Sequence, residues 1–157
     1  TELLEKNKSV LRYDKYILRI HKENPIAQRL TTIPGIGELT ATATVANVGD
    51  PRQFKNGREF AAYLGLVPKQ RSSGGKHNLL GISKRGDKYI RTMLVHGARV
   101  MVAFNDRYTD RIPKRTKWIS GVRERRGFCK AAVAVANKNA RIAWSLMMKD
   151  EDYNAAI

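Results

Sequence analysis

Apolar residues recur at helical spacing over the first twenty positions of the chain. Leu3, Val10 and Ile17 stand seven residues apart, and further leucines and isoleucines flank them. This wide stripe predicts a long helix. Such a stripe either packs on a core or pairs with a second helix. Lys6 at one repeated position and the short length of the repeat leave both interpretations open. Pro25 then marks the end of this helix or the first turn of the next.

The segment from Ile26 to Val48 has the layout of a helix-hairpin-helix. A short helix is predicted to run to about Thr32, a turn follows from Ile33 to Gly37, and a second helix starts near Glu38. We expect this second helix to turn three residues toward the core, and they are Leu39, Ala43 and Ala46.

The turn of this predicted hairpin is rich in glycine. Gly35 and Gly37 allow a tight backbone turn and a close approach of amide groups to a ligand, while the helix that follows points its positive end outward. These properties favour a bound phosphate. A plain helical hairpin with a Pro-Gly turn has the same local sequence and is an equal alternative before charge is considered.

Four more helices are predicted downstream. One begins around Gly57, one begins at Asp87, a basic helix covers 114–126, and a last helix covers about 128–149. The expected inward positions are Ile90, Leu94, Gly97, Met101 and Phe104 in the second, Trp118 and Val122 in the third, and Ala132, Ala136, Ala140, Ala143 and Met147 in the last.

Alternating strand patterns are scarce in this sequence, so the predicted fold class is all-α. The expected architecture is a helical domain with a helix-hairpin-helix element, preceded by a helical, coiled-coil-like arm. We place the end of the arm at residues 1–24 and the domain at residues 25–157.

The charge balance indicates a polyanionic partner. The chain has 30 lysines and arginines against 14 acids, which gives a formal charge of +16 and a pI near 10.3. The cations are spread from Lys6 to Lys149, as on a folded surface, and no apolar run is long enough to cross a membrane. We therefore expect nucleic acid as the partner and no membrane.

Cysteine and histidine indicate no metal chemistry. The single cysteine, Cys129, excludes an internal disulfide, and the three histidines lack the spacing of metal ligands. We expect a reducing, cytoplasmic compartment and no metal or cofactor in this chain.

A serine pair and two glycines stand in a strongly basic segment between residues 63 and 91, where we expect a flexible loop. The ordinary interpretation is a surface connection. The alternative is a site where Ser73 attacks a phosphodiester, because a covalent intermediate conserves the bond energy for rejoining. The nearby cations that would stabilise the transition state are Arg71, Lys76, Lys84, Arg85 and Arg91. No convincing general base accompanies them.

The order of residues around this loop is specific. Tyr63-Leu64-Gly65-Leu66-Val67-Pro68 precedes the serines, and Gly81-Ile82-Ser83-Lys84-Arg85-Gly86-Asp87 and Ile90-Arg91 follow them. This order resembles the C-terminal, serine-bearing domain of bacterial insertion-sequence transposases related to Piv-type DNA invertases, the DEDD-type, bridge-RNA-guided recombinases. The resemblance extends from about Arg29 to Trp144.

The resemblance implies three parts in the whole protein. An N-terminal RuvC-like domain binds divalent metal through four acidic residues, a helical arm helps the protein to dimerise, and the last domain carries the nucleophilic serine. The family's serine directly precedes the glycines of the basic loop, which corresponds to Ser73, with Ser72 as the second choice. The resemblance further implies magnesium in the N-terminal domain and a structured guide RNA as a partner beside DNA.

Two functional hypotheses follow. The first is the catalytic C-terminal domain of a DNA transposase or recombinase, which cleaves and rejoins DNA through Ser73 together with the RuvC-like domain. The second is a non-catalytic helix-hairpin-helix module that binds DNA or RNA backbone. The chain opens at Thr1 without a methionine and inside a predicted helix. We therefore expect a fragment of a longer polypeptide, which binds nucleic acid but does not cut it alone.

Overall fold

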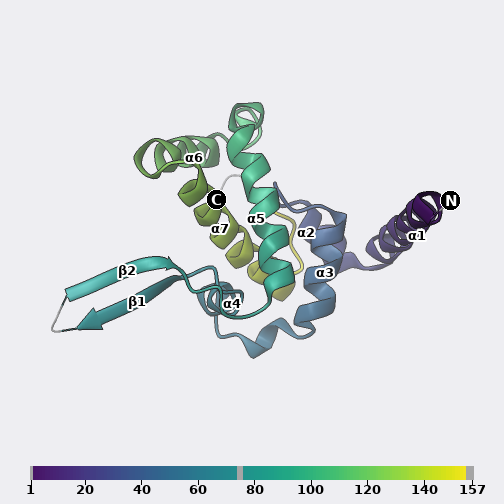
Figure 1. Cartoon of the computed structure of the whole chain (residues 1–157), viewed down its shortest axis with the longest axis horizontal. Helices are drawn as coiled ribbons and strands as arrows, with labels where there is room; N and C mark the ends of the chain where they lie inside the picture. The colour runs from purple at the N-terminus through teal and green to yellow at the C-terminus, as the bar shows by residue number, and fades with distance from the viewer. Residues whose placement is uncertain (1, 74–75, 155–157) are drawn as a thin grey trace.

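The computed structural model describes residues 2–73 and 76–154, and this part of the chain is mainly helical (Figure 1). The predicted all-α class is confirmed. In chain order the elements are α1 (Glu2–Glu23), α2 (Pro25–Thr31), α3 (Glu38–Val48), η1 (Pro51–Gln53), α4 (Gly57–Tyr63), β1 (Pro68–Ser73), β2 (Lys76–Ile82), α5 (Lys88–Ala103), η2 (Asn105–Tyr108), α6 (Pro113–Arg126) and α7 (Phe128–Met148).

The starts of α2 and α5 are set by side chains that cap the first backbone N–H groups. Asn24 accepts a hydrogen bond from the Ala27 N–H at 2.9 Å at the start of α2, and Asp87 accepts one from the Ile90 N–H at 2.6 Å at the start of α5. Each cap satisfies a donor that the helix cannot pair internally. The predicted start at Asp87 is therefore confirmed.

The core is built around α7, which packs against α5, α4 and α6. Its inward face consists mainly of alanines, which let the neighbouring helices approach closely. The sequence prediction of this face is confirmed, because Ala132, Ala136, Ala140, Ala143 and Met147 are all buried. Larger side chains fill the space around it, among them Leu30, Ile33, Phe60, Leu64 and Leu94.

The inward face of α5 is confirmed except at its last predicted position. Ile90, Leu94 and Met101 are buried, whereas Phe104 is 45% exposed. The prediction for Phe104 is wrong because α5 ends at Ala103, and the backbone of Phe104 has left helical geometry at φ −111° and ψ 31°.

The predicted inward face of α3 is wrong at two of its three positions. Leu39 and Ala46 are exposed, and the buried side chains are Thr40, Ala41, Thr44 and Val48. Helical periodicity could not select the face because most positions of α3 are apolar or small. Burial of Thr44 is inexpensive because its hydroxyl donates to the Thr40 carbonyl at 2.7 Å.

Trp118 and Val122 of α6 are half-buried and pack against the core, as predicted for this face. The fully buried residues of this helix include Ile119 and Thr116. The face of α6 that meets the core is therefore centred near Ile119, and Trp118 lies at its margin.

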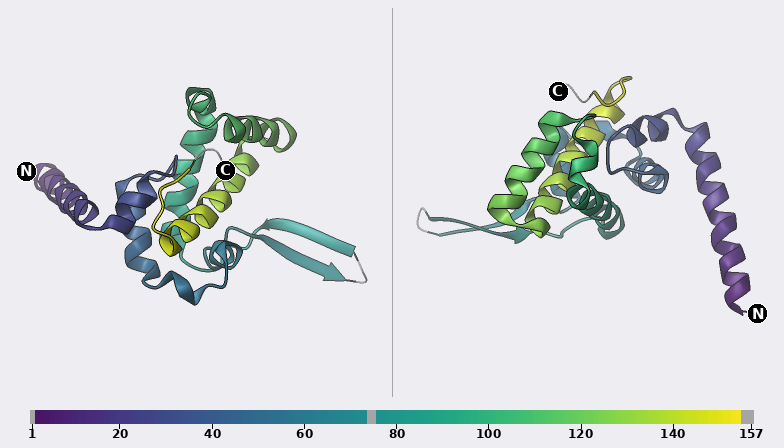
Figure 2. Two further views of the ribbon diagram at one scale, coloured as in Figure 1. Left: turned by 180° about the vertical axis from the view of Figure 1, so that it is seen from behind. Right: turned by 90° about the horizontal axis from the view of Figure 1, so that it is seen from above.

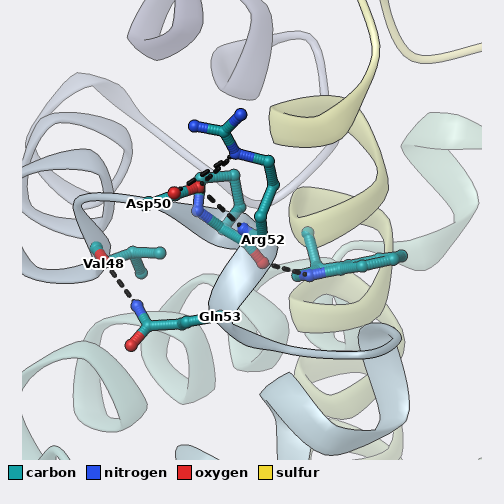
Figure 3. Close-up of polar contacts among 6 residues, drawn as sticks. Val48, Asp50, Arg52 and Gln53 are labelled. Carbon is teal, nitrogen blue, oxygen red and sulfur yellow. Dashed lines mark hydrogen bonds and ion pairs between the residues drawn. The ribbon is translucent and has the colours of Figure 1, made fainter.

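A short polar segment connects α3 to α4, and this segment is hydrogen-bonded to α7 (Figure 3). Asp50 accepts hydrogen bonds from both the side chain and the backbone N–H of Arg52, and Gln53 donates to the Val48 carbonyl at 2.8 Å. The hydrogen bonds from Arg52 hold the pKa of Asp50 below its usual value. Trp144 of α7 donates its indole N–H to the Pro51 carbonyl at 3.0 Å.

Two elements extend away from the helical body. α1 projects at one end and the pair of strands at the other, as the opposite views in Figures 1 and 2 show. No residue of α1 is buried, and its contacts within the chain are with α2 and α3. Among the described residues, no helix is long and apolar enough to span a membrane.

Candidate nucleic-acid interface

The predicted serine loop is wrong in one respect, because the segment forms two antiparallel strands. The register pairs Arg71 with Asn78, Ser72 with His77 and Ser73 with Lys76. The strands were missed because this ribbon stands off the body and has no core face to impose an alternating pattern. The two glycines at positions 74 and 75 lie outside the described residues.

Ser73 is the last residue of β1, and Lys76 is the first residue of β2. The described part of the structure includes the backbone of these two residues and of Arg71 but not their side chains. The nucleophilic role of Ser73 and the phosphate contacts of Arg71 and Lys76 therefore stay predictions.

The base of the hairpin is a narrow neck in which the chain entering β1 touches the chain leaving β2. The Ser83 N–H donates to the Val67 carbonyl at 2.8 Å, and the Lys84 N–H donates to the Gly65 carbonyl at 3.1 Å. Two glycines make this contact possible. A Cβ on Gly86, whose φ is +103°, would lie 1.7 Å from the Tyr63 carbonyl oxygen, and one on Gly65 would lie 2.3 Å from that of Arg85.

The neck explains why its sequence order is so specific. Gly65 and Gly86, which belong to that order, lie in the neck, and their close contacts fix the direction in which the hairpin leaves the body. We define the serine hairpin as residues 68–73 and 76–82, and the neck as residues 63–67 and 83–87.

Three of the predicted phosphate-binding cations lie at or beside the neck. Lys84 and Arg85 are exposed, and the backbone of Lys84 adopts a positive φ of 55°. Arg91 is half-buried and donates to the Leu64 carbonyl at 3.1 Å and to the Asp87 carbonyl at 3.3 Å. Arg91 therefore ties α5 to the C-terminal end of α4, and its contact with a phosphate stays a prediction.

The two glycines of the helix-hairpin-helix turn have different environments. Gly35 has a φ of +89°, and a Cβ there would lie 2.9 Å from the Met101 sulfur and 3.2 Å from the Gly97 carbonyl oxygen. Gly37 is the N-cap of α3, and a Cβ on it would meet no atom within 4 Å. Gly35 is therefore needed for close packing on α5, and only Gly37 is open to a ligand.

Sequence reasoning missed the partners of this turn. Gly97 of α5 meets the turn so closely that a Cβ on it would lie 1.9 Å from the Gly35 carbonyl oxygen. Fully buried Asn139 donates to the Pro34 carbonyl at 3.1 Å and accepts a hydrogen bond from Arg115. The signals in the sequence were Gly97 within a helix and Asn139 within an alanine-rich stripe. Neither signal indicates which residue it contacts.

The turn and the serine hairpin are not brought together. Asn47 near the end of α3 donates to Asp87 in the neck at 3.1 Å, so the C-terminal end of α3 lies against the neck. The helix has 11 residues, which places Gly37 about 15 Å away along its axis. The two predicted phosphate sites would therefore contact different parts of a nucleic acid.

In the part of the chain that the structure describes, the carboxylates do not cluster. Within the described residues, no group of three or more histidine, cysteine, aspartate or glutamate side chains could hold a metal ion. Asp87, the acid nearest the hairpin in the sequence, is engaged as the cap of α5 and as the acceptor for Asn47.

Comparison with known proteins defines the family of this helical, basic chain with a glycine-built neck. Residues 27–113 match the transposase family described as IS116/IS110/IS902. The transposase of insertion sequence element IS1111A from Coxiella burnetii is 45% identical over 153 residues, which cover 98% of this chain and 41% of the relative. A probable family 20 transposase from Pseudomonas aeruginosa is 51% identical over 126 residues, with 80% and 36% covered.

The relatives also include a protein named for DNA inversion. The pilin gene-inverting protein of Moraxella bovis is 29% identical over 137 residues, which cover 85% of this chain and 40% of that protein. This chain belongs to the IS116/IS110/IS902 transposase family. It spans about two fifths of the length of these three relatives.

Proposed function

We propose that this chain is the C-terminal domain of a DNA transposase or recombinase that cleaves and rejoins phosphodiesters through Ser73. One observation carries the proposal: Ser73 ends the first strand of a hairpin that projects from a strongly basic body (Figure 1). A nucleic-acid strand can reach such a position without entering the core. The names of the relatives support DNA as the substrate.

The proposed chemistry is a transesterification in two steps. The Ser73 oxygen attacks phosphorus, its bond to phosphorus forms as the bond to one strand oxygen breaks, and that oxygen leaves as the strand end. We assign the base that takes the serine proton to the rest of the full-length protein. In the second step the hydroxyl of another strand end displaces the serine, whose oxygen regains a proton.

The cations around the hairpin would act on the phosphate. Arg71, Lys76, Lys84 and Arg85 would stabilise the negative charge that develops on its oxygens during attack. Arg91 would act mainly as a positioning residue, because it holds the neck through the Leu64 carbonyl.

We also propose magnesium and a RuvC-like domain for the full-length protein. The described residues hold no acidic cluster for a metal ion, so the four acidic ligands of the family would have to come from outside this chain. Bound there, magnesium would supply Lewis-acid stabilisation of the phosphate. No step assigned to this chain's own residues requires the ion.

A structured guide RNA and self-association complete the proposal. The guide RNA is proposed from the family resemblance, and the charge of +16 would allow contacts with a second polyanion beside DNA. Exposed apolar residues on α1 support association, since Leu3 is 71% exposed, Leu4 64% and Leu11 61%. We propose that α1 pairs with a helix of a second copy.

The helix-hairpin-helix turn favours a second candidate function, which is non-catalytic binding of nucleic-acid backbone. Gly37 has open space around it at the start of α3, where backbone N–H groups are available to a phosphate. In this alternative Ser73 has no chemical role, and substituting it changes nothing.

Covalent adduct trapping distinguishes the two candidates. Full-length protein, element-end DNA and its RNA are combined, and Ser73→Ala is compared with Ser72→Ala as the matched control one residue away. We expect a denaturation-resistant protein–DNA adduct with wild type and Ser72→Ala, and loss of the adduct with Ser73→Ala while DNA binding is retained. An adduct that survives in Ser73→Ala, or one that is lost only in Ser72→Ala, refutes the assignment of Ser73.

A further inference from the structure

A broad groove lies between the base of the serine hairpin and helices α4, α6 and α7, with a volume of about 1070 Å³. Pro68 and Ile82, which pair at the base of the hairpin, line one end. Gly57 forms a close wall, because a Cβ on it would lie 2.9 Å from the Arg141 carbonyl oxygen. The groove is therefore continuous with the hairpin that carries Ser73.

The charged residues that line this groove, among those the structure describes, are all basic. Arg58, Lys130, Lys138 and Arg141 line it, and none of the described residues that line it is acidic. Within the described part of the chain, none of these four cations forms an ion pair with a carboxylate. On α7 the positions that line the groove lie opposite the alanine face that packs on the core. The groove thus gathers positive charge without an internal counter-charge.

Lys138 shows what this concentration of charge does to the free protein. Its ammonium lies 4.7 Å from the centre of the Trp118 ring, a cation–π contact. Partial burial and then the neighbouring Arg115 and Arg141 charges lower the pKa of Lys138. A phosphate placed in the groove would offset the repulsion from Arg115 and Arg141.

Both aromatic residues of the groove, Trp118 and Trp144, are partly buried and packed against the core. One Trp118 face is within cation–π distance of Lys138, and the Trp144 N–H is bonded to the Pro51 carbonyl. Stacking platforms for single strands present free ring faces beside basic residues. This groove suits contacts to the phosphates of a duplex better than stacking on unpaired bases.

We propose that this groove, which we call the α7 groove, binds the phosphate backbone of the DNA duplex that flanks the bond attacked by Ser73. The inference rests on the proposed function for the choice of DNA and on the groove's own residues for the binding. β1 runs from Pro68 to Ser73, about 17 Å at roughly 3.3 Å per residue. This length corresponds to about five base-pair steps of duplex. The bound phosphates would therefore lie about five positions from the scissile one.

The tryptophans offer a direct probe of the α7 groove. The chain has two tryptophans, and both Trp118 and Trp144 line this groove. A short DNA duplex titrated into the 157-residue chain should change the tryptophan fluorescence, and an RNA duplex of the same sequence serves as the comparison. Fluorescence that responds to RNA and not to DNA overturns the choice of DNA.

A charge-matched pair of variants tests the cations. The groove variant replaces Lys130, Lys138 and Arg141 by alanine, and the control variant replaces three exposed lysines away from the groove, which are Lys8, Lys15 and Lys117. We expect at least about tenfold weaker DNA binding in the groove variant at low salt and a salt slope reduced by up to about 3. Equal weakening in both variants overturns the inference, because only total charge would then matter.

Two further measurements keep the outcomes separate. If the triple variant has lost its helical circular dichroism signal, the single variants Lys130→Ala and Arg141→Ala are used in its place, since both positions are exposed. Each single variant should reduce the salt slope by about 1. Neutral methylphosphonates about five positions from the scissile phosphate should weaken binding of wild type and leave that of the groove variant unchanged. If the groove variant binds unmodified DNA as tightly as wild type does, the α7 groove is overturned even if Ser73 forms its adduct. Weakened binding without any Ser73 adduct refutes the nucleophile and leaves the groove.

Discussion

The contact between Gly97 and Gly35 gives a sharp prediction about stability. Gly97→Ala adds a Cβ that would lie 1.9 Å from the Gly35 carbonyl oxygen, whereas real Cβ contacts essentially never fall below 3.0 Å. Either α5 or the helix-hairpin-helix turn must therefore move by about 1 Å. The turn cannot move freely, because Ile33 and Ile36 are buried in the core on either side of it.

The expected loss of stability can be estimated from two opposing effects. Forcing extra volume into a packed contact costs about 1–3 kcal/mol. Replacing glycine by alanine within a helix returns up to about 1 kcal/mol, because the unfolded chain loses freedom. Because the added Cβ would meet backbone and not the end of a flexible side chain, the cost lies in the upper part of its range, about 2–3 kcal/mol. We therefore expect the free energy of unfolding of Gly97→Ala to fall by about 1–2 kcal/mol. For a chain of this size the melting temperature should fall by about 2–8 °C.

Gly121→Ala is the matched control for this measurement. Gly121 also lies within a helix, but its added Cβ would meet the end of the flexible Arg125 side chain at 3.2 Å. Urea and thermal unfolding of both variants should show a loss for Gly97→Ala and a neutral or favourable change for Gly121→Ala. If Gly97→Ala is as stable as Gly121→Ala, the close packing of the turn on α5 is refuted.

Two further predictions concern the buried polar link and the arm. Asn139→Ala leaves the Pro34 carbonyl without its donor and removes the amide acceptor of buried Arg115, which keeps its hydrogen bond to the Tyr153 hydroxyl. Urea unfolding should therefore show a loss of about 2–4 kcal/mol, and a loss well below 1 kcal/mol contradicts the link. Replacing exposed Leu4 and Leu11 by glutamate should shift sedimentation of the chain from a dimer toward a monomer without lowering its melting temperature, and an unchanged distribution contradicts association through α1.

Local signals in the sequence were sufficient for most helix boundaries. Asn24 and Asp87 cap the helices that follow them, and Pro25 and Pro113 stand at first turns. These residues act through their own backbone neighbourhood, so no knowledge of the fold is needed to interpret them.

Features that depend on tertiary contacts could not be predicted in the same way. Glycine is required at position 35 because Gly97, far away in the sequence, packs against it. Glycine is required at position 86 because the Tyr63 carbonyl lies against it. The strands of the serine hairpin leave no periodic pattern because the ribbon contributes no side chain to the core among the described residues. The α7 groove combines cations of α7 with Arg58 of α4 and the base of the hairpin, so its composition emerges only from the assembled helices.

The neck has a consequence for how members of this family can diverge. The described core residues stop at Leu66 and resume at Ile90, so the hairpin between them can lengthen or shorten without repacking the protein. Each residue added to both strands would move the tip by about 3.3 Å, close to one base-pair step. The length of the serine hairpin thus sets the distance between the α7 groove and Ser73. Related proteins could evolve different distances while they keep the same helical body.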